Sequence, residues 1–408
     1  MKKSLFFTVA VALSSQSLAY QTASNHSYLR NSSFTNNYAA DIGGYGDLKL
    51  MYLGESGENT RIKFENDLSI NINLYAESSE ILKYGIKIIP YFNNYFGNRI
   101  NYYAFIDSYY GKFEFGSVLD VTESLRGGAD SIAIGPGIIN NSLTRHLNLP
   151  TRQVNLGNFI FGPGTLMNQN FGYHEYELDR KYWNDSRYLN KINYYLPNIY
   201  GLQLGFSLTP NVQLTEKNLQ SIAVGANNNF PLGQFFGIAA NYIETLWDIG
   251  ILVSAVSEFN VNNSINIAGG VKEKAAINFR SYDLGLGISY FGLTFSASYG
   301  INESNKLTAE LIGNLEEGKK SGKYITYGGA YEFSSFSISV NRFESKLVEN
   351  KFESTNYGVK MNIAKGLAIY MEYFDCHYDY SPTGHPGENP DQIGERARGV
   401  LAGVLINF

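Results

Sequence analysis

Alternation of polar and apolar residues with a period of two runs through most of this 408-residue chain. The stretch Ser186–Pro210, SRYLNKINYYLPNIYGLQLGFSLTP, contains two such runs, separated by the turn-forming residues Pro197–Gly201. In the second run, Leu202, Leu204, Phe206 and Leu208 alternate with Gln203, Gly205, Ser207 and Thr209. Successive side chains of a strand point to opposite faces. The stretch therefore predicts an antiparallel hairpin with one apolar face and one polar face.

A longer run of the same kind covers Arg61–Tyr75, where one face is polar through Asn73 and the other is apolar except at Asn66. Two architectures have such strands. A secreted sandwich packs its apolar faces together and uses short strands. A transmembrane barrel turns the apolar faces to lipid, keeps a polar lumen and needs strands of roughly 9–11 residues. Many runs here reach that length. The composition, with 41 Gly, 15% aromatic and 17% charged residues, is what strands with alternating apolar and polar faces would give. The pattern favours the barrel over the sandwich.

The N-terminus predicts export. Met1-Lys2-Lys3 is positive, Leu5–Leu13 is apolar but too short to span a bilayer, and Ser17-Leu18-Ala19 offers the small residues that a signal peptidase reads. We expect a signal peptide over residues 1–19 with cleavage after Ala19. Removal of two lysines moves the formal charge from −5 to about −7. A chain this acidic does not suggest a nucleic-acid partner.

The remaining chain is predicted to form one domain. Residues 20–45 are a polar lead-in without a sustained period, and residues 46–408 form the barrel. Residues 119–185 break the alternation, and a structureless insert of this length is expected only where a loop has a function. Tight turns are predicted near Pro197, Pro231, Asn262, Gly292, Ser334 and Lys365. The count of runs is nearer 18 than 16, and the number stays even if both chain ends lie on one side.

Four stretches resemble the Gram-negative porins, most closely the general diffusion porins of alphaproteobacteria. They are FENDLSINI, YYAFIDSYYGKFEFGSVLD, NKINYYLPNIYGLQLGFSLTP and the terminal VLINF. The resemblance implies an all-β, antiparallel transmembrane barrel in the cell outer membrane, with 16 strands favoured and 18 possible, and a long loop after the fifth strand that folds inward. It also implies a homotrimer surrounded by outer-membrane lipid, and a terminal Phe408 read by the outer-membrane assembly machinery. No cofactor is expected.

The inward loop is where the resemblance places selection of solutes. Charges fixed in a constriction select ions electrostatically, and we expect Asp120, Glu123, Arg126 and Asp130 to lie there. Bases on early strands are expected to form the opposing wall of the lumen, namely Arg61, Lys63, Lys83, Lys87 and Arg99. For each single residue the alternative is a solvated surface charge. The acids of the loop favour a weak preference for cations, although the basic wall opposes it.

Other chemistry finds little support in the sequence. Glu65 and Asp67 are a carboxylate pair at strand spacing, but charged residues are common in barrel lumens, so catalysis is not expected. Cys376, His377 and His385 suggest a metal cluster only weakly, because their surroundings read as a strand end and an external loop. No phosphate-binding glycine loop, zinc signature or nucleophile elbow occurs.

The sequence thus predicts a passive, water-filled channel for small hydrophilic solutes and ions. Two alternatives remain open. A substrate-specific channel would need aromatic residues in series along the lumen, and Tyr103, Phe105 and Tyr109 share one strand face. A plugged barrel with a role in adhesion or surface structure would use the long insert to fill the lumen.

Overall fold

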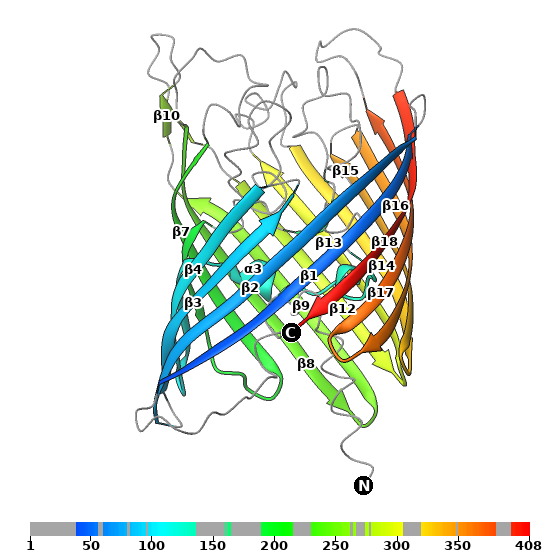
Figure 1. Ribbon diagram of the computed structural model, residues 1–408. Coiled ribbons are helices and arrows are strands. Elements are labelled where there is room, and N and C mark those ends of the chain that lie inside the picture. Colours follow the sequence, from blue (N-terminus) through cyan, green and yellow to red (C-terminus); the bar gives the residue numbers. More distant parts are fainter. Residues whose placement is uncertain are drawn as a thin grey trace.

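Sixteen strands of the described chain close into one antiparallel barrel (Figure 1). The computed structural model describes residues 38–55, 60–79, 82–94, 97–135, 160, 162–164, 189–214, 230–261, 264–266, 274–276, 279–304, 320–347, 350–380 and 393–408. The barrel strands are β1 (Tyr38–Glu55), β2 (Arg61–Ser79), β3 (Leu82–Asn93), β4 (Gly97–Ser108), β5 (Gly111–Ser117), β6 (Asn190–Tyr195), β7 (Leu202–Leu214), β8 (Phe230–Leu246), β9 (Ile249–Val261), β12 (Phe279–Tyr290), β13 (Leu293–Ser304), β14 (Lys320–Phe333), β15 (Phe336–Leu347), β16 (Asn350–Ala364), β17 (Leu367–Tyr380) and β18 (Ile393–Asn407).

Each barrel strand pairs with the next barrel strand along the chain, and β1 closes the barrel against β18 from Tyr45↔Asn407 to Glu55↔Ala397. Closure leaves no sheet edge, which a strand structure needs in hydrocarbon. The hairpin of β10 (Ser264–Asn266) and β11 (Lys274–Ala276) forms a separate two-stranded sheet between β9 and β12. The expected 16 strands are confirmed, and this extra hairpin brings the total of described strands to the alternative count of 18.

The two ends of the barrel differ in the length of their connections. Short turns join β4 to β5, β6 to β7, β8 to β9, β12 to β13, β14 to β15 and β16 to β17, and we call this the short-turn end. Two-residue hairpin turns require a positive φ, which Phe291, Ser334 and Gly366 adopt. The opposite end, which we call the long-connection end, is where β5 ends at Ser117 and β6 begins at Asn190, so the longest insert joins two strands there. Among the described residues, no helix has the length and apolar character needed to cross a membrane.

One predicted turn was misplaced. Pro231 lies inside β8, and the nearby hairpin turn is instead at Trp247–Asp248. That turn contains neither Gly nor Pro, and Trp247 itself takes the positive φ of 58°, so composition gave no signal for it. Asn262 lies outside the described residues, so the turn predicted near it stays a prediction. The predicted turns at Pro197, Gly292, Ser334 and Lys365 are confirmed.

The barrel also begins earlier than expected. β1 starts at Tyr38, inside the stretch predicted to be a polar lead-in, and it pairs with β2 from Tyr38↔Ala76 onward. The alternation was hidden because Gly44 and Gly46 interrupt the outward, apolar face of β1 between Ile42 and Leu48. Residues 1–37 lie outside the described part of the chain, so the predicted signal peptide does too.

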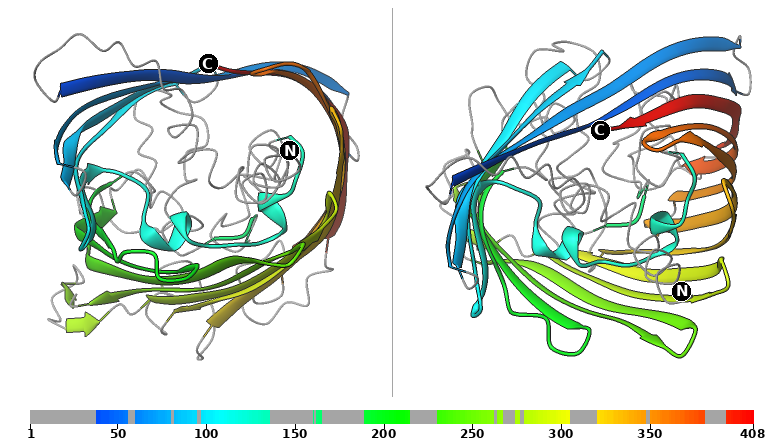
Figure 2. Two further views of the ribbon diagram at one scale, coloured as in Figure 1. Left: turned by 90° about the horizontal axis from the view of Figure 1, so that it is seen from below. Right: turned by 60° about the horizontal axis from the view of Figure 1, so that its bottom comes forward.

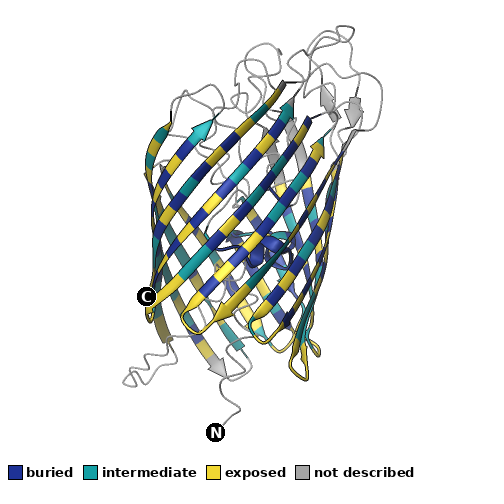
Figure 3. Cartoon of the chain, turned by 90° about the vertical axis from the view of Figure 1, so that its right-hand side faces the viewer, coloured by how far each residue is buried: buried dark blue, intermediate teal, exposed yellow. Residues whose placement is uncertain are grey.

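The two faces of the wall follow the predicted alternation (Figure 3). On β2 the outward Ile62 and Phe64 are apolar and 71% and 59% exposed, whereas the inward Glu65, next to Phe64, is 2% exposed. On β7, Leu202 and Phe206 face outward, and the inward Ser207 and Thr209 are buried. Outward apolar and inward polar faces are the arrangement of a barrel that has lipid as its outer solvent.

The C-terminal residues close the last seam. Phe408 exchanges backbone hydrogen bonds with Gly44, at 2.8 and 3.2 Å, and its ring lies over the Cα of that glycine. A side chain at position 44 would overlap the ring. The alternate residues Ala402, Ile406 and Phe408 are exposed on the outer face, as the terminal sequence predicted.

Candidate functional site in the barrel lumen

A segment inside the barrel is the main feature of the lumen. Residues 118–135 leave the end of β5 and follow the inner wall (Figure 2). They include the one-turn helix α3 (Val121–Ser124), which packs against β7 and β8, and the 3₁₀ turn η1 (Ala129–Ser131), which packs against β13 and β14. We refer to residues 118–135 as the lining segment. It follows the wall over much of the circumference.

Asp120 fixes the start of the lining segment. Its Oδ1 accepts hydrogen bonds from the backbone N–H and the hydroxyl of Thr122, both at 2.8 Å, so Asp120 is the N-cap of α3. Its Oδ2 accepts a 2.5 Å hydrogen bond from Ser207 on β7. Val121 and Leu125 add apolar contacts with the wall. They form a buried cluster with three wall residues, Tyr195, Ala239 and Val256.

Small residues on the wall make room for the lining segment. A β-carbon at Gly205 would lie 3.0 Å from the β-carbon of Val121, and one at Gly237 would lie 2.5 Å from Oδ1 of Asp120. Further along, Gly285 is covered by the carbonyl of Gly127, whose own N–H donates to Ser254 Oγ at 2.9 Å. The glycines and serines of four strands therefore form a shallow groove in which the backbone of the segment lies.

Arg126 and Asp130 form a buried ion pair within the segment, four residues apart. Burial alone would lower the pKa of the Arg126 guanidinium, but the carboxylates of Asp130 and Asp283 raise that pKa well above its ordinary value. Asp283 on β12 also accepts a hydrogen bond from the hydroxyl of Tyr324, and the same hydroxyl accepts one from the backbone N–H of Gly164 at 3.1 Å. This network joins two parts of the insert to one place on the wall.

The far end of the lining segment reaches β15 to β17. The N–H of Ile134 donates to Ser339 Oγ at 3.0 Å, and Gly135 lies against Tyr370 with a φ of +83°. Ile160 is also held here, because its carbonyl accepts a 2.5 Å hydrogen bond from Ser345. Around them is a buried apolar cluster on the inward faces of β14–β18 and β1, which includes Phe343, Phe352, Phe374, Met51 and Leu401.

This apolar cluster is an exception to the polar lumen that the sequence predicts. Its inward aromatic residues are 0% exposed at Phe343, Phe352 and Phe374. They cover the side chains of Ile134 and Ile160, so the exception lies where the insert packs against the wall. The sequence signal for this cluster was the presence of aromatic residues at inward positions of the alternation. That signal was hard to recognise because many outward positions are aromatic as well.

The four residues predicted for the constriction all lie on the lining segment. Asp120, Arg126 and Asp130 are buried and bonded to protein groups, and only Glu123 is partly exposed. Asp120 attaches the segment to the wall through Ser207, whereas Arg126 and Asp130 pair with each other within the segment. The action of all three on passing ions stays a prediction. Residues 136–159, 161 and 165–188 lie outside the described residues, so the larger 119–185 loop as a constriction also stays a prediction.

The predicted basic wall lies on the opposite side, on β2–β4. Arg61 is paired with Glu55, and Lys83 lies 3.6 Å from Glu77 and 3.6 Å from the ring centre of Tyr75. Arg99 stacks on Tyr91 at 4.4 Å. Lys63 is half-buried beside Arg61, and Lys87 is buried near Lys112 and Glu114. The structure thus places all five bases on one side of the barrel, away from the lining segment.

The family of this chain follows from its similarity to known proteins. A family model described as Gram-negative porin matches residues 7–381, which is most of the chain. The chain belongs to the Gram-negative porin family. An uncharacterized protein of Rickettsia bellii (strain RML369-C) is 21% identical over 354 residues, 75% of this chain and 76% of that protein.

Solved structures share the fold of this porin. One is the anion-selective porin from Comamonas acidovorans, with a TM-score of 0.56 and 14% identity, covering 91% of this chain and all of that one. Another is a trimer form of OmpT, an outer membrane protein of Vibrio cholerae, with a TM-score of 0.52 and 10% identity over 91% of this chain and all of that one. Membership of the porin family makes the chain an outer-membrane diffusion channel.

Sequence reasoning missed a buried charged cluster of this porin. Lys49 on β1 is 2% exposed and is ion-paired with Asp67, with Asp47 at 3.5 Å and with Glu65 at 3.8 Å. Tyr370 donates to Asp47 at 2.9 Å and so connects the cluster to β17. Asp47 and Lys49 are alternate residues of β1, and that spacing was the available signal.

Of the residues considered above for catalysis and for metal binding, those that the structure describes lie within the barrel wall, where most of them contact other protein groups. Glu65 and Asp67 both accept hydrogen bonds from Asn93, and both lie beside Lys49. Cys376 is buried on the inward face of β17, whereas the next residue, His377, is exposed on the outward face with Asp379 at 3.1 Å. Two residues on opposite faces of a strand cannot bind one ion. His385 lies outside the described residues.

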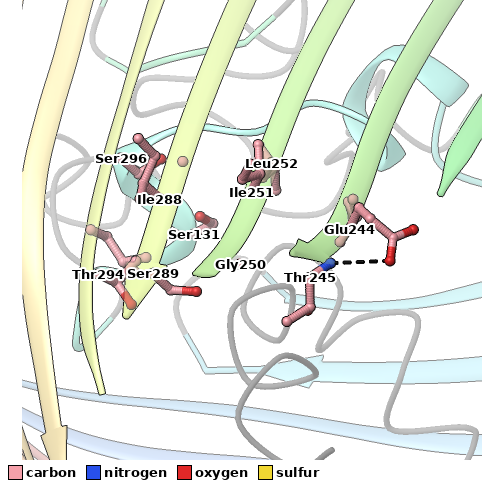
Figure 4. A pocket seen from close by; sticks show the side chains of 13 residues that line it. Ser131, Glu244, Thr245, Gly250, Ile251, Leu252, Ile288, Ser289, Thr294 and Ser296 are labelled. Carbon is pink, nitrogen blue, oxygen red and sulfur yellow. Dashed lines mark hydrogen bonds between the residues drawn. The ribbon is translucent and has the colours of Figure 1, made fainter. Parts of the chain in front are cut away.

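The predicted aromatic series on β4 is only partly present. Tyr103 and Phe105 are on the inward face, but Tyr109 lies in the turn after β4 and is 77% exposed. A small pocket of about 30 Å³ lies below η1, between the lining segment and β8, β9, β12 and β13 (Figure 4). This volume is about that of one water molecule. The pocket therefore has no room for a solute.

Proposed function

We propose that this porin is a passive, water-filled channel for small hydrophilic solutes and ions, narrowed by the insert at 119–185. The observation that carries the proposal is the placement of the lining segment along β6–β17, with charged residues of β2–β4 facing it from the other side. A polar passage between them needs no cofactor and no energy source, because solutes move down their own gradients.

The assembly proposed is a homotrimer in outer-membrane lipid. The OmpT structure of similar fold is described as a trimer form, which supports the same state here. The short-turn end and both ends of the mature chain would face the periplasm. We further propose that the signal peptide is cleaved after Ala19, so that the mature protein begins at Tyr20, and that the outer-membrane assembly machinery reads the exposed Phe408. The mass of the mature protein tests the cleavage site.

Purified protein in planar bilayers tests the channel and the assembly together. We expect stepwise current increases on insertion, and closure of each inserted unit in three equal steps if it is a trimer. Current that varies with solute size in a neutral-polymer series would measure the passage. A folded protein that inserts into lipid but never conducts would contradict the channel proposal, and closure in single steps would contradict the trimer alone.

Two observations favour narrower functions and define further outcomes of the same recordings. On the wall opposite the lining segment, Lys83 lies over the ring of Tyr75 and Arg99 lies over the ring of Tyr91. Such a surface suits a substrate-specific channel for anions with a planar or sugar face. Saturable block of the current by such an anion would favour that function. The apolar cluster at Ile134 and Ile160 favours a partly plugged barrel with a surface role, which would give conductance only after the insert is shortened.

A further inference from the structure

The outer face of β15–β18 changes character along the barrel axis. Toward the short-turn end it is apolar and exposed, with Ile338, Met361, Ile369 and Met371. Above them lie the rings of Tyr357 and Tyr373, with centres 6.2 Å apart. Toward the long-connection end the same outward positions carry charges, and these are Arg342, Glu344, Lys346, Lys351, Glu353, Asp375, His377, Asp379, Arg396 and Arg398. We call these ten residues the outer charged belt.

The position of the belt fits the level of lipid headgroups. A charge on the lipid face costs far more free energy at the middle of the bilayer than near its surface. Tyrosine rings on the outer face of a barrel gather at the interface between hydrocarbon and headgroups. Because the belt begins directly beyond Tyr357 and Tyr373, its charges lie beyond the hydrocarbon on the long-connection side.

Two poles of opposite charge lie next to each other in the belt. Arg342 on β15 is held by two carboxylates, Glu344 at 2.5 Å and Glu353 at 2.7 Å, which leaves this pole with an excess of one negative charge. It also donates to Thr355 at 3.1 Å. The acidic pole is therefore ordered by its own hydrogen bonds, with its carboxylates on β15 and β16.

The basic pole has the reverse composition. Asp375 on β17 accepts hydrogen bonds from two guanidinium groups. Arg396 donates two, one of them from Nε at 2.7 Å, and Arg398 donates one from Nε at 3.3 Å. This leaves an excess of one positive charge, and the side chains of both arginines are about half exposed. Arg342 and Glu353 of the acidic pole line one outer groove of about 380 Å³ together with Asp375, Arg396 and the two tyrosines.

We propose that this groove binds the headgroup of a membrane lipid that carries both a phosphate and a primary ammonium group. Arginine binds phosphate oxygens through paired N–H groups, so the phosphate lies at Arg396, which lines the groove, with Arg398 next to it on the same face of β18. The ammonium lies at Glu353 and over the tyrosine rings, which attract cations through their faces. The acyl chains then continue along the apolar wall below Tyr357 and Tyr373, where Met361 and Met371 are exposed.

Native mass spectrometry of the detergent-solubilised protein tests the site with three lipids of equal chain length. Phosphatidylethanolamine has both groups, phosphatidylglycerol lacks the ammonium, and phosphatidylcholine has its ammonium hydrogens replaced by methyl groups. We expect phosphatidylethanolamine to be retained at least fivefold more than the other two. Soluble glycerophosphoethanolamine, which lacks the chains, should compete only weakly if the lipid as a whole is recognised, and strong competition would assign the site to the free headgroup instead.

Paired variants separate the two poles. Arg396→Gln with Arg398→Gln should lower retention of both phosphatidylethanolamine and phosphatidylglycerol, whereas Glu353→Gln should lower that of phosphatidylethanolamine alone. Lys323→Gln is the matched control, because Lys323 is an outward, exposed cation on β14 that does not line the groove. Migration of unheated protein in a gel and unchanged single-channel conductance establish that each variant is folded, since all four positions lie outside the lumen.

Equal retention of the three lipids, or equal loss in Lys323→Gln, would overturn the proposal. So would conversion of oligomers to monomers by the Arg396→Gln and Arg398→Gln changes, because the belt would then be a contact with a second copy of the chain. Loss of lipid retention with the oligomer intact supports the headgroup site.

Discussion

At the scale of single residues, glycines on the inner wall determine how closely the lining segment approaches. A β-carbon at Gly285 would overlap the carbonyl of Gly127 and lie 2.5 Å from Ser254 Oγ. Gly285→Ala should therefore push the segment away from β12, toward the open lumen. Overpacking of this kind costs about 1–3 kcal/mol. We expect lower single-channel conductance together with a lower melting temperature, followed by the circular dichroism of the strands.

Gly287 provides the control for this change on the same face of the same strand. A β-carbon there would have its nearest neighbour, the Leu252 β-carbon, at 3.4 Å, which is ordinary contact. Gly287→Ala should leave conductance and melting temperature as they are. If both variants conduct like the unmodified channel, the segment does not rest on β12 as closely as described.

At the scale of elements, the lining segment should be attached to the wall while the channel conducts. The β-carbon of Val121 on α3 lies 3.0 Å from the position that a β-carbon of Gly205 would take, and disulfides join β-carbons about 3.5–4.5 Å apart. A small adjustment should let Val121→Cys and Gly205→Cys form a disulfide on oxidation. Because the bond holds the segment where it already lies, current before and after reduction should be the same.

A pair that the fold keeps apart gives the comparison for this cross-link. Val121→Cys with Gly287→Cys should stay reduced, because Gly287 contacts Leu252, Ser296 and Phe295 and not α3. Single variants report any bond to the buried Cys376. Failure of the first pair to cross-link, or a large rise in current on its reduction, would mean that α3 leaves the wall in the open channel.

The strands and the segment differ in how far sequence alone predicts them. Each strand has its own alternation, so the faces at Arg61–Tyr75 and at Leu202 were predictable without knowing any neighbour. The path of the lining segment depends on contacts across the chain, such as Gly127 with Ser254 and Ile134 with Ser339. No local pattern marks Gly205, Gly237 and Gly285 as one groove, because they become neighbours only when the barrel closes. The burial of Asp120 and Asp130 was hidden for the same reason.

At the scale of the whole molecule, charge selection depends on which charges lie near the passage. The mature chain is negative, yet at physiological salt a charge more than about 8 Å from an ion counts little. Among the acids of the lining segment, Asp120 caps α3 and Asp130 is paired with Arg126, whereas Glu123 is partly exposed. Bases such as Lys63 and Lys83 lie on β2 and β3, on the other side of the barrel.

Neutralisation of one charge on each wall should therefore shift selectivity in opposite directions. In a KCl gradient at low salt, Glu123→Gln should move the reversal potential toward anions, and Lys83→Gln should move it toward cations. Both shifts should shrink at 1 M salt, where the screening length is about 3 Å. Asp130→Asn is a poorer probe, because it leaves Arg126 without its buried partner and is expected to loosen the segment as well. If neither single variant changes the reversal potential at low salt, Glu123 and Lys83 lie away from the path of the ions. Charges elsewhere along the passage would then select the ions.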